Sequence, residues 1–421
     1  MSGRPDVRRW GLWGGYALLL FGAPLVWNSG LGHTMLAQIG IAIIACLSYN
    51  ILFGQGGMLS FGHAVYSGLG AYATIHTLNH VSAGGLPLPV SLLPLVGGLA
   101  GLGCAALLGA VTTRKAGTPF AMITLGIGEL VWSLAMMLPA YFGGEGGVSG
   151  NRVVGPPVWG ISFGPQVQVV YLIAVYCFVC TLLMYGLTQT PLGRMLNAVR
   201  DNPERVEFIG YSAQQVRYRA FMISGFFAGI AGGLAALNFE TVTPEMLGSA
   251  RSGAYLLFVF IGGAGFFFGP ILGAVLMVVS LVLLSEWTQA WLLYLGLAFV
   301  WMVVVAPGGL AAVLVTQLQA IGRGALQRLW RLYLGLGLTA CTALVGAAAM
   351  IEMLYHLQLH AALGPELRFL GLRLNAHAPG HWAAAAAALL LGAAALKLVH
   401  GRFRAAWEGM PLHPQPLEDG R

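Results

Sequence analysis

Residues 50–72 read NILFGQGGMLSFGHAVYSGLGAY, a stretch that is largely apolar but interrupted by clustered glycines. A glycine costs roughly 1 kcal/mol in a helix interior, so this cluster indicates a helix break or a close contact between helices. Gly54 and Gly57 allow the backbone to turn, and Ser60 and His63 then open the next helix. A helix that begins inside a protein points free N–H groups into any cavity there. The stretch therefore predicts a discontinuous helix, from which membrane transporters build binding sites and pathways.

A second glycine cluster, GGAGFFFGPILGA, occupies residues 262–274 and precedes another apolar run. The apolar stretch 251–286 that contains it is too long for one membrane crossing, so we divide it into two spans at these glycines. A Phe-Gly pair occurs in both clusters, at 61–62 and at 268–269, which suggests an internal repeat. The charge pattern places both breaks near the cytoplasmic side, so it does not demonstrate an inverted repeat. At each single position, a tight loop beside a glycine-rich packing face is the alternative to a pathway residue.

The composition of the whole chain is that of a membrane protein. Of the 421 residues, 57% are hydrophobic and only 8% are charged, against about 25% charged residues in soluble domains. So few charges cannot cover the surface of a soluble globule of this length. The composition therefore argues against a soluble enzyme, a disordered chain and a coiled coil.

The successive apolar runs predict an all-α polytopic membrane protein. Each run is close to the length of about 20 residues that a helix needs to cross a bilayer. We expect about ten core transmembrane helices, broken at glycine-rich segments, and a C-terminal hairpin of two helices. The expected core spans are 10–28, 33–53, 58–78, 88–113, 119–142, 165–188, 220–240, 251–267, 268–286 and 290–306, and the hairpin spans are 331–355 and 382–400.

The positive charges predict an orientation with the N-terminus in the cytoplasm. In that orientation seventeen of the 21 Lys and Arg residues lie on the inner side, which satisfies the positive-inside rule. The net charge of +7 then reflects membrane orientation, and nucleic acid is not expected as a partner. The four positive residues expected outside are Arg152, Arg251, Arg368 and Arg373.

The first apolar run follows Arg4, Arg8 and Arg9 and so resembles the charged start of a signal peptide. The run is longer than a typical signal peptide, and no clear small-residue cleavage site follows it. We therefore expect residues 1–32 to form a retained signal-anchor span.

The most polar stretch between spans is residues 190–220, which carries five arginines and three acidic residues. Pro203 can begin a short helix, Glu204 and Glu207 suit the positive end of its dipole, and Gly210 can end it in a left-handed cap. A solvated loop that only sets topology is the alternative. The length of the loop, unusual in so economical a chain, favours a docking surface on the cytoplasmic face.

Glu129 lies within an apolar span, where an ionisable group costs several kcal/mol unless it is paired or hydrated. We expect it to face the interior of the helix bundle, where it makes a structural hydrogen bond between helices or contacts a substrate. The candidate residues for helix breaks or a translocation path are therefore Gly54, Gly57, Ser60, Gly62, His63, Glu129, Gly262, Gly263, Gly265 and Gly269.

No motif for nucleotide binding or catalysis occurs in the sequence. The pattern G-x-x-x-x-G-K-[ST] is absent, as are HExxH, GxSxG and zinc-finger spacings of cysteine and histidine. We therefore expect no catalytic residue, no metal ligand and no cofactor, and the chain is not expected to be an enzyme. Four histidines, His356, His360, His377 and His381, could hold a metal, but histidines at the membrane interface are the simpler interpretation.

Seven motifs in one order resemble a known family. They are NxLFGxxGxLSxGH from residue 50, TLGIGEL from 124, GGxxG near 143–150, PLGRxLxAxRDNxE from 191, AFxISGxxAGxAGGL from 220, GGxGxxxGPxLGA from 262 and PGGL from 307. Each motif is weak alone, but together they are similar to the permease of branched-chain amino acid ABC importers, the LivM-type family. The resemblance covers about residues 33 to 314.

The resemblance implies a membrane subunit that pairs with a second, LivH-like permease. Two cytoplasmic ATP-binding subunits and a periplasmic substrate-binding protein complete such an importer in the bacterial cytoplasmic (inner) membrane. The loop 190–220 matches the family's ATPase-coupling loop, in which Arg200, Glu204, Glu207 and Gly210 would be the coupling positions. ATP binding would close the ATPase pair and pull on this loop, which would switch the permease between its inward-facing and outward-facing states.

The two ends of the chain depart from the family pattern. We expect residues 33–314 to form the permease core, preceded by the variable span 1–32. Residues 315–421 extend beyond the usual ending at 307–310 and are expected to form the two-helix hairpin. Its alanine-rich second helix suggests that it packs on this permease or on its partner.

The expected function is therefore an importer permease for branched-chain or other hydrophobic amino acids. The same importer type for urea, short amides or aromatic acids is the alternative, since relatives of the family are associated with those substrates. A secondary transporter driven by an ion gradient would need paired ionisable residues inside the membrane, and only Glu129 clearly qualifies.

Overall fold

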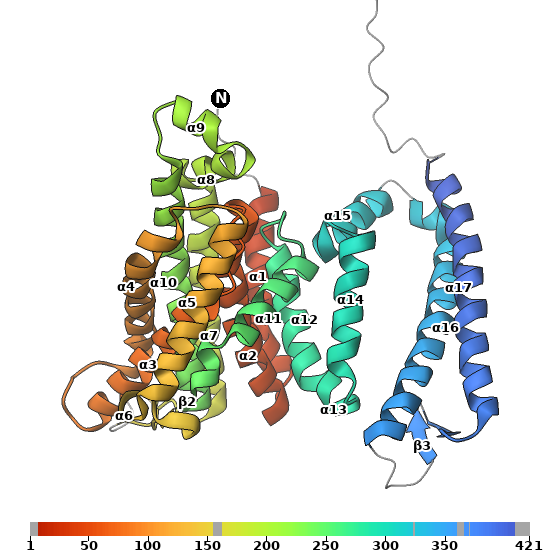
Figure 1. Ribbon diagram of the computed structural model, residues 1–421, viewed down its shortest axis with the longest axis horizontal. Helices are drawn as coiled ribbons and strands as arrows, with labels where there is room; N and C mark the ends of the chain where they lie inside the picture. Colours follow the sequence, from red (N-terminus) through yellow and green to blue (C-terminus); the bar gives the residue numbers. More distant parts are fainter. Residues whose placement is uncertain (1–6, 155–161, 323–324, 360–365, 370, 409–421) are drawn as a thin grey trace, which may run out of the picture. The chain divides into compact units, whose positions relative to one another are not determined.

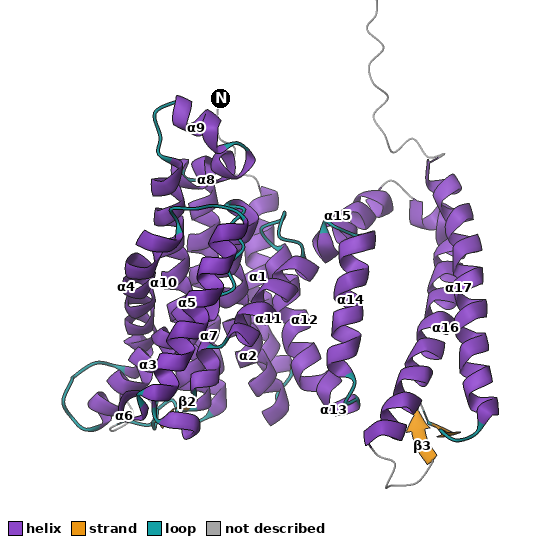
Figure 2. Ribbon diagram, in the orientation of Figure 1, coloured by secondary structure: helices purple, strands orange, loops and turns teal. Residues whose placement is uncertain are grey.

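The computed structural model describes residues 7–154, 162–322, 325–359, 366–369 and 371–408. Helices dominate the described chain, which also holds two small antiparallel sheets of two strands each (Figures 1 and 2). The chain divides into two compact units. The first consists of Met1–Val282 with Trp301–Ala311, and the second of Leu283–Val300 with Ala312–Arg421.

The first unit is a bundle of helices of unequal length. Its elements are α1 (Val7–Val26), α2 (Gly30–Asn50), the π-helix η1 (Ile51–Gln55), α3 (His63–Ser82), η2 (Val90–Leu92), α4 (Leu93–Thr112), α5 (Thr118–Met137), α6 (Pro139–Phe142), η3 (Gly144–Gly146), β1 (Val148–Ser149), α7 (Gln166–Gln189), α8 (Pro191–Asp201), α9 (Pro203–Phe208), α10 (Ala213–Phe239), β2 (Thr241–Val242), η4 (Pro244–Leu247), α11 (Ser249–Gly262) and α12 (Gly269–Val279).

The remaining elements follow from residue 280 onward, and the first of them lies across the boundary between the two units. They are the π-helix η5 (Ser280–Leu284), α13 (Ser285–Trp287), α14 (Trp291–Val305), α15 (Gly309–Gly322), α16 (Ala325–Leu359), β3 (Glu366–Phe369), β4 (Leu372–Asn375) and α17 (Pro379–Glu408). The division between the units falls within η5, α14 and α15.

The described helices have the lengths and composition of membrane spans. Eight, counted with the short segments that continue them, are long and apolar enough to cross a bilayer, and the bent pair of α14 and α15 brings the number to as many as nine. Residues 10–26 of α1 and the whole of α11 are shorter apolar helices. A helix occupies each span expected from the sequence. The prediction of an all-α polytopic membrane protein is confirmed.

Glycines hold the centre of the first unit together. Helices α3, α4 and α10 pack closely, with small residues four apart on the facing sides of α4 and α10. A methyl group added to Gly101 of α4 would fall on the carbonyl oxygen of Gly225 in α10, and one added to Gly70 of α3 would lie 2.6 Å from the Cα of Gly229. Small residues let helix backbones approach in lipid, where apolar burial cannot drive association. This packing explains much of the chain's glycine content.

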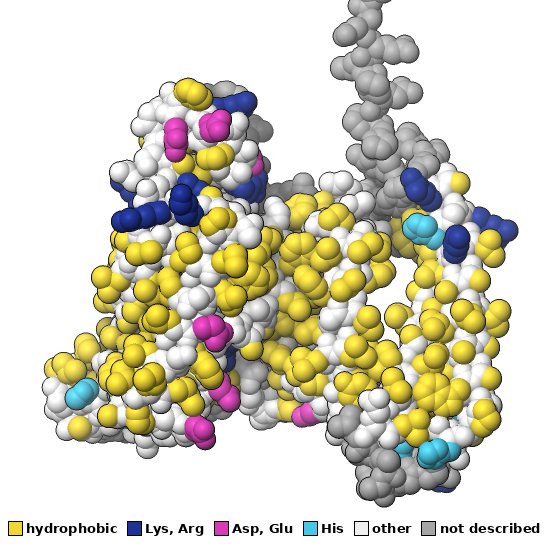
Figure 3. Space-filling model, viewed as in Figure 1, with side chains coloured by type: hydrophobic (Ala, Val, Ile, Leu, Met, Phe, Trp, Pro, Cys, Tyr) yellow, Lys and Arg dark blue, Asp and Glu magenta, His cyan; other side chains and the backbone are white. Residues whose placement is uncertain are grey.

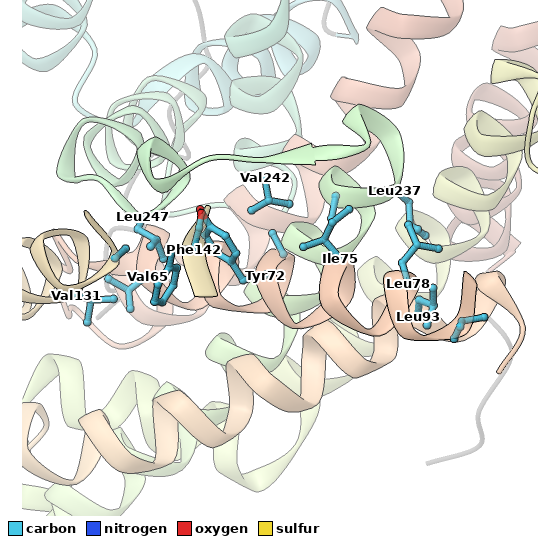
Figure 4. Packing of buried hydrophobic residues seen from close by; sticks show 14 of the residues in the cluster. Val65, Tyr72, Ile75, Leu78, Leu93, Val131, Phe142, Leu237, Val242 and Leu247 are labelled. Atoms are coloured by element: carbon cyan, nitrogen blue, oxygen red, sulfur yellow. The ribbon is translucent and has the colours of Figure 1, made fainter. Parts of the chain in front are cut away.

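Large side chains fill the space around α3 toward its C-terminal end. Figure 4 shows Tyr72, Ile75 and Leu78 of α3 in one cluster with Phe142, Val242 and Leu237. The Tyr72 hydroxyl donates to the carbonyl oxygen of Phe142 over 3.1 Å. The cluster anchors the loops that follow α5 and α10, where β1 and β2 pair with Val148 opposite Val242.

Arg152 joins the ends of two helices, α10 and α7, at this same end of the first unit. The residue is only 8% exposed. Its guanidinium donates to the carbonyl oxygens of Leu237 and Asn238 at the end of α10, each over 3.2 Å, and to Gln166 Oε1 at the start of α7 over 3.1 Å. Its backbone N–H donates to Glu240 Oε1 over 2.9 Å. A charge buried this well is tolerated because carbonyl oxygens satisfy its donors.

Basic side chains gather at the opposite end of the first unit. On the face that Figure 3 shows, Lys and Arg side chains of this unit lie around α8 and α9, above a largely hydrophobic surface. This distribution agrees with the positive-inside pattern of the sequence.

The second unit is built on an antiparallel hairpin of α16 and α17. The two helices approach through small residues, since a methyl group added to Gly346 would lie 2.5 Å from the Leu389 nitrogen and one added to Gly392 would lie 2.5 Å from the Ala343 nitrogen. Strands β3 and β4 pair between the helices, with Leu367 opposite Leu374. The expected two-helix hairpin at the C-terminal end is confirmed.

Candidate functional site

The first predicted helix break lies between α2 and α3. The helical backbone continues from α2 through the π-helix η1, where an extra residue per turn marks local strain. The chain then turns at Gly57, whose φ of +63° favours glycine. The Tyr49 hydroxyl donates to the carbonyl oxygen of Ser60 over 3.0 Å and so holds the extended residues against α2. Helix α3 begins at His63 with Gly62 as its N-cap.

The start of α3 is packed among buried polar groups. His63 is fully buried, and its Nε2 lies 2.9 Å from the Ser48 hydroxyl. The same hydroxyl also lies 2.7 Å from Ala45 O, to which it can donate. The backbone N–H of Ala64 donates to Ser252 Oγ of α11 over 2.9 Å. The break is therefore tied to both α2 and α11.

Three buried polar atoms at this break have no hydrogen-bond partner within the described chain. They are Asn50 Oδ1, Ser60 Oγ and His63 Nδ1. Such atoms are rare in folded proteins, and each costs free energy when it is removed from water. Gly62 is tightly enclosed as well, because a methyl group added to it would fall on the carbonyl oxygen of Thr124 in α5.

The second predicted break separates α11 from α12. Gly263, with φ of +107°, ends α11. A methyl group added to Gly262 would fall on the backbone of Gly269, and one added to Gly269 would fall on the backbone of Gly263. The two helices pack antiparallel from there, since Gly273 approaches the Phe258 carbonyl. Gly265 has open space around it. A helix break lies at these glycines, and α11, with 14 residues, is a shorter apolar helix than the membrane span expected there.

The two breaks, far apart in sequence, lie against each other. A methyl group on Gly54 of η1 would fall on the carbonyl oxygen of Ala264, in the turn between α11 and α12. The rings of Phe53 and Phe260 lie beside this contact, with centroids 6.1 Å apart. The chain therefore has one junction at which two discontinuous helices meet.

The polar loop between α7 and α10 reaches this junction through Arg200. Its Nη1 donates to the carbonyl oxygen of Gly54 over 2.5 Å, and its Nε donates to Asp201 Oδ1 over 3.0 Å. Its Cγ also packs on Gly57, where a methyl group would lie 2.8 Å away. A carbonyl in a π-helical turn lacks the regular intrahelical bond, so a cation is a suitable donor for it.

Arg200 stands on α8, a helix that the sequence analysis did not anticipate. Thr190 caps it by accepting from the Gly193 N–H over 3.3 Å, and Pro191 occupies the first turn. Its apolar face, with Leu196 and Val199, is buried. Because the loop carries so many charges, this narrow amphipathic pattern did not indicate a helix in the sequence.

The short helix expected from Pro203 is confirmed as α9. Asn202 caps it by accepting from the Arg205 N–H over 3.0 Å, and Gly210 follows with φ of +89°. Glu204, Glu207 and Gly210 are exposed.

Apolar side chains are exposed beside these acidic residues. Phe208, Ile209 and Tyr211 are 89%, 63% and 55% exposed. These residues, together with α9, form the tip of the loop. The tip is more apolar than a solvated loop requires.

Glu129 lines a cavity in the first unit. The cavity has a volume of about 830 Å³ and lies among α2, α5, α11 and α12. Most of its wall is apolar, and the polar groups that face it include Gln38, Glu245 and Arg251. Arg251 Nε donates to the hydroxyl of Tyr255, which also lines the cavity, over 3.1 Å.

Arg251 and Tyr255 are not among the residues predicted from the sequence, because an arginine expected on the outer side is explained by its charge alone. An arginine at the start of a short apolar helix was the available signal. Within the described residues, groups of three or more His, Cys, Asp or Glu that could hold a metal ion are absent.

The chain is similar to known transport proteins. A family model described as "Branched-chain amino acid transport system / permease component" matches residues 33–306. The "High-affinity branched-chain amino acid transport system permease protein LivM" of Salmonella typhimurium is 33% identical over 293 residues, which are 64% of this chain and 67% of the relative. The protein of the same name from Escherichia coli K12 is 32% identical over 293 residues, with the same coverage. No solved structure matches the chain. The chain thus belongs to the family of branched-chain amino acid transport system permease components.

Proposed function

We propose that the chain is the permease subunit of a binding-protein-dependent ABC importer for branched-chain or other hydrophobic amino acids. The observation that carries this proposal is the contact of Arg200 with Gly54. It connects the cytoplasmic loop directly to the junction of two discontinuous helices. Movement of the loop would therefore act on a break in a membrane helix and not on an uninterrupted helix.

The exposed tip of α9 is the proposed contact with the ATPase. Phe208 and Ile209 would enter a groove on an ATP-binding subunit, and Glu204 and Glu207 would meet basic groups at its rim. Closure of the ATPase pair on ATP would move α9, and α8 would transmit this movement through Arg200. Energy from hydrolysis in the partner would then alternate the side on which the path opens.

The complete importer in this proposal contains further chains. They are a LivH-like second permease, two cytoplasmic ATP-binding subunits and a periplasmic substrate-binding protein, assembled in the bacterial inner membrane with the N-terminus of this chain in the cytoplasm. Within this chain, residues 33–314 would be the permease core. Residues 1–32 would be a signal-anchor span, and 315–421 an extension that packs on the core or its partner.

Co-purification with the products of neighbouring genes, followed by reconstitution in liposomes, tests the proposal. Leucine-loaded binding protein should stimulate ATP hydrolysis, and omission of this chain should abolish the stimulation. A complex that assembles but responds only to urea, short amides or aromatic acids would replace the substrate assignment. Transport that follows an ion gradient without any ATPase would contradict the importer itself.

A further inference from the structure

A carboxylate of the C-terminal hairpin lies within an apolar helix. Glu352 belongs to α16, in which Leu329–Gln358 is long and apolar enough to cross a membrane. An ionisable group in such a helix is costly unless partners satisfy it. Thr288 donates to Glu352 Oε1, and the Tyr294 hydroxyl donates to the same oxygen over 3.1 Å. The carboxylate therefore joins α16 to the segment at the start of α14.

A second hydrogen bond joins α16 to α15. The Tyr333 hydroxyl donates to Gln317 Oε1 over 2.6 Å. The Tyr333 ring also packs edge-on against Phe403 of α17, with centroids 5.0 Å apart. Along α16, Tyr333 and Glu352 are about 28 Å apart at 1.5 Å per residue. The hairpin is therefore joined to the preceding part of the chain at two distant points, both within the second unit.

The two attachment points lie on either side of a bend in the chain. Helices α14 and α15 are inclined to each other by 56°, with the break at residues 306–308. Tyr294 belongs to α14 and Gln317 to α15. A short turn between two helices can act as a hinge. A third helix that is bonded to both of them restricts that hinge.

The bend itself packs against the second helix break. A methyl group added to Gly309 would fall on the backbone of Gly263, in the turn after α11. A methyl group added to Gly263 would lie 2.6 Å from the Gly308 carbonyl oxygen. These residues all belong to the first unit. Because close-packed backbones transmit displacement, the bend cannot shift without moving the turn at Gly263.

We propose that the C-terminal hairpin is an intramolecular strap that holds the bend between α14 and α15 and, through it, the turn at Gly263. Glu352 is its attachment to α14, and Tyr333 is its attachment to α15. The surface that the hairpin binds thus belongs to this chain. This inference goes beyond the proposed importer function, because the hairpin lies after residues 33–306, which the family model matches.

Hydrogen–deuterium exchange of the purified full-length chain in lipid nanodiscs tests the strap. Peptides that contain residues 303–312 report opening of the bend, and peptides from α4 report the rest of the first unit. Glu352→Leu removes the acceptor, and loss of a hydrogen bond to a charged group shifts an opening equilibrium about tenfold. Exchange at the bend should therefore rise by that factor. The peptide around Gly263 should follow it, while α4 stays unchanged.

Conservative variants identify the groups that form the attachment. Glu352→Gln keeps an oxygen that accepts from the same hydroxyls but loses the charge that strengthens the bonds, so exchange should rise less than in Glu352→Leu. Tyr333→Phe removes the other attachment and should by itself raise exchange at the bend about fivefold. Thr342→Val is the matched control, since its hydroxyl donates over 2.8 Å to Leu338 O of the same helix. It should match the wild type.

Two results would overturn the strap. Unchanged exchange at the bend in both Glu352→Leu and Tyr333→Phe would show that the hairpin does not restrain it. Equal rises in these variants and in Thr342→Val would mean that any change in α16 loosens the chain. If Glu352→Leu also exchanges throughout α4, it has unfolded, and Glu352→Gln with Tyr333→Phe decides the question. None of these results depends on leucine transport, so the strap and the importer function are tested separately.

Discussion

At the scale of single residues, Arg200 has the most consequential position. It belongs to the polar loop between α7 and α10, yet it donates to the backbone of a broken helix. Its other polar contact, with the neighbouring Asp201, is exposed and contributes little. The residue therefore matters for what it connects more than for the stability of its own helix.

Removal of that connection should uncouple the importer. Arg200→Ala deletes a hydrogen bond from a charged donor, which contributes about 1.5–3 kcal/mol, so we expect leucine-stimulated ATP hydrolysis to fall about tenfold. Hydrolysis rates of reconstituted complexes give the measurement. Arg194→Ala, at an exposed arginine of the same helix α8, is the control expected to behave as wild type. Equal losses in the two variants would mean that general charge, not the Gly54 contact, is responsible.

At the scale of elements, close backbone contact decides which helices can pair. Helix α4 presents Gly97 and Gly101 to α10, while Gly103 of the same helix has open space around it. The first two positions exclude any larger side chain. The third carries no such restriction, so it provides an internal comparison.

Substitution by alanine should change the stability of the fold in opposite directions at the two kinds of glycine in α4. Gly101→Ala places a methyl group on a carbonyl of α10 and should destabilise the fold by about 1–3 kcal/mol. Gly103→Ala adds no contact and removes a poor helix former, so it should be neutral or stabilising by up to about 1 kcal/mol. Thermal unfolding of the purified protein in detergent compares them. Similar unfolding temperatures for both variants would argue against the glycine interface.

Helix α9 offers a second test at this scale. Glu207→Arg reverses the charge at the proposed ATPase contact and should abolish stimulated hydrolysis while insertion into the membrane continues, since the side chain is exposed. Membrane fractionation and transport assays separate the two effects. Gln214→Arg adds the same charge nearby, at the exposed start of α10, and should be tolerated. Normal transport in Glu207→Arg would remove α9 from the coupling role.

At the scale of the whole molecule, the distribution of charge predicts its orientation. An impermeant thiol reagent should label Gly146→Cys in intact spheroplasts, because the loop after α5 is expected outside. Ala116→Cys should react only after the membrane is permeabilised, because Arg114 and Lys115 retain that turn in the cytoplasm. Both variants need Cys341→Ser, since that native thiol is exposed. The reverse pattern of labelling would invert the proposed topology.

The sequence was informative where a local pattern has one physical meaning. Apolar length located the spans, clustered glycines located both breaks, and Pro203 with Gly210 located α9. What it could not provide were contacts between distant segments, such as Gly54 against the turn at Ala264. Glu129 and Arg251 likewise line one cavity only because α5 and α11 both border it.

The position of Arg152 has a mechanical consequence for the molecule as a whole. Its guanidinium joins the start of α7 to the end of α10, and the same two helices are connected at their other ends through α8 and α9. Together they form a closed frame whose long sides are two membrane helices. A frame fastened at both ends resists splaying, so a force applied to one short side displaces the opposite side with it. In this way a displacement of α8 and α9 would reach the opposite end of the first unit without any one residue spanning the distance.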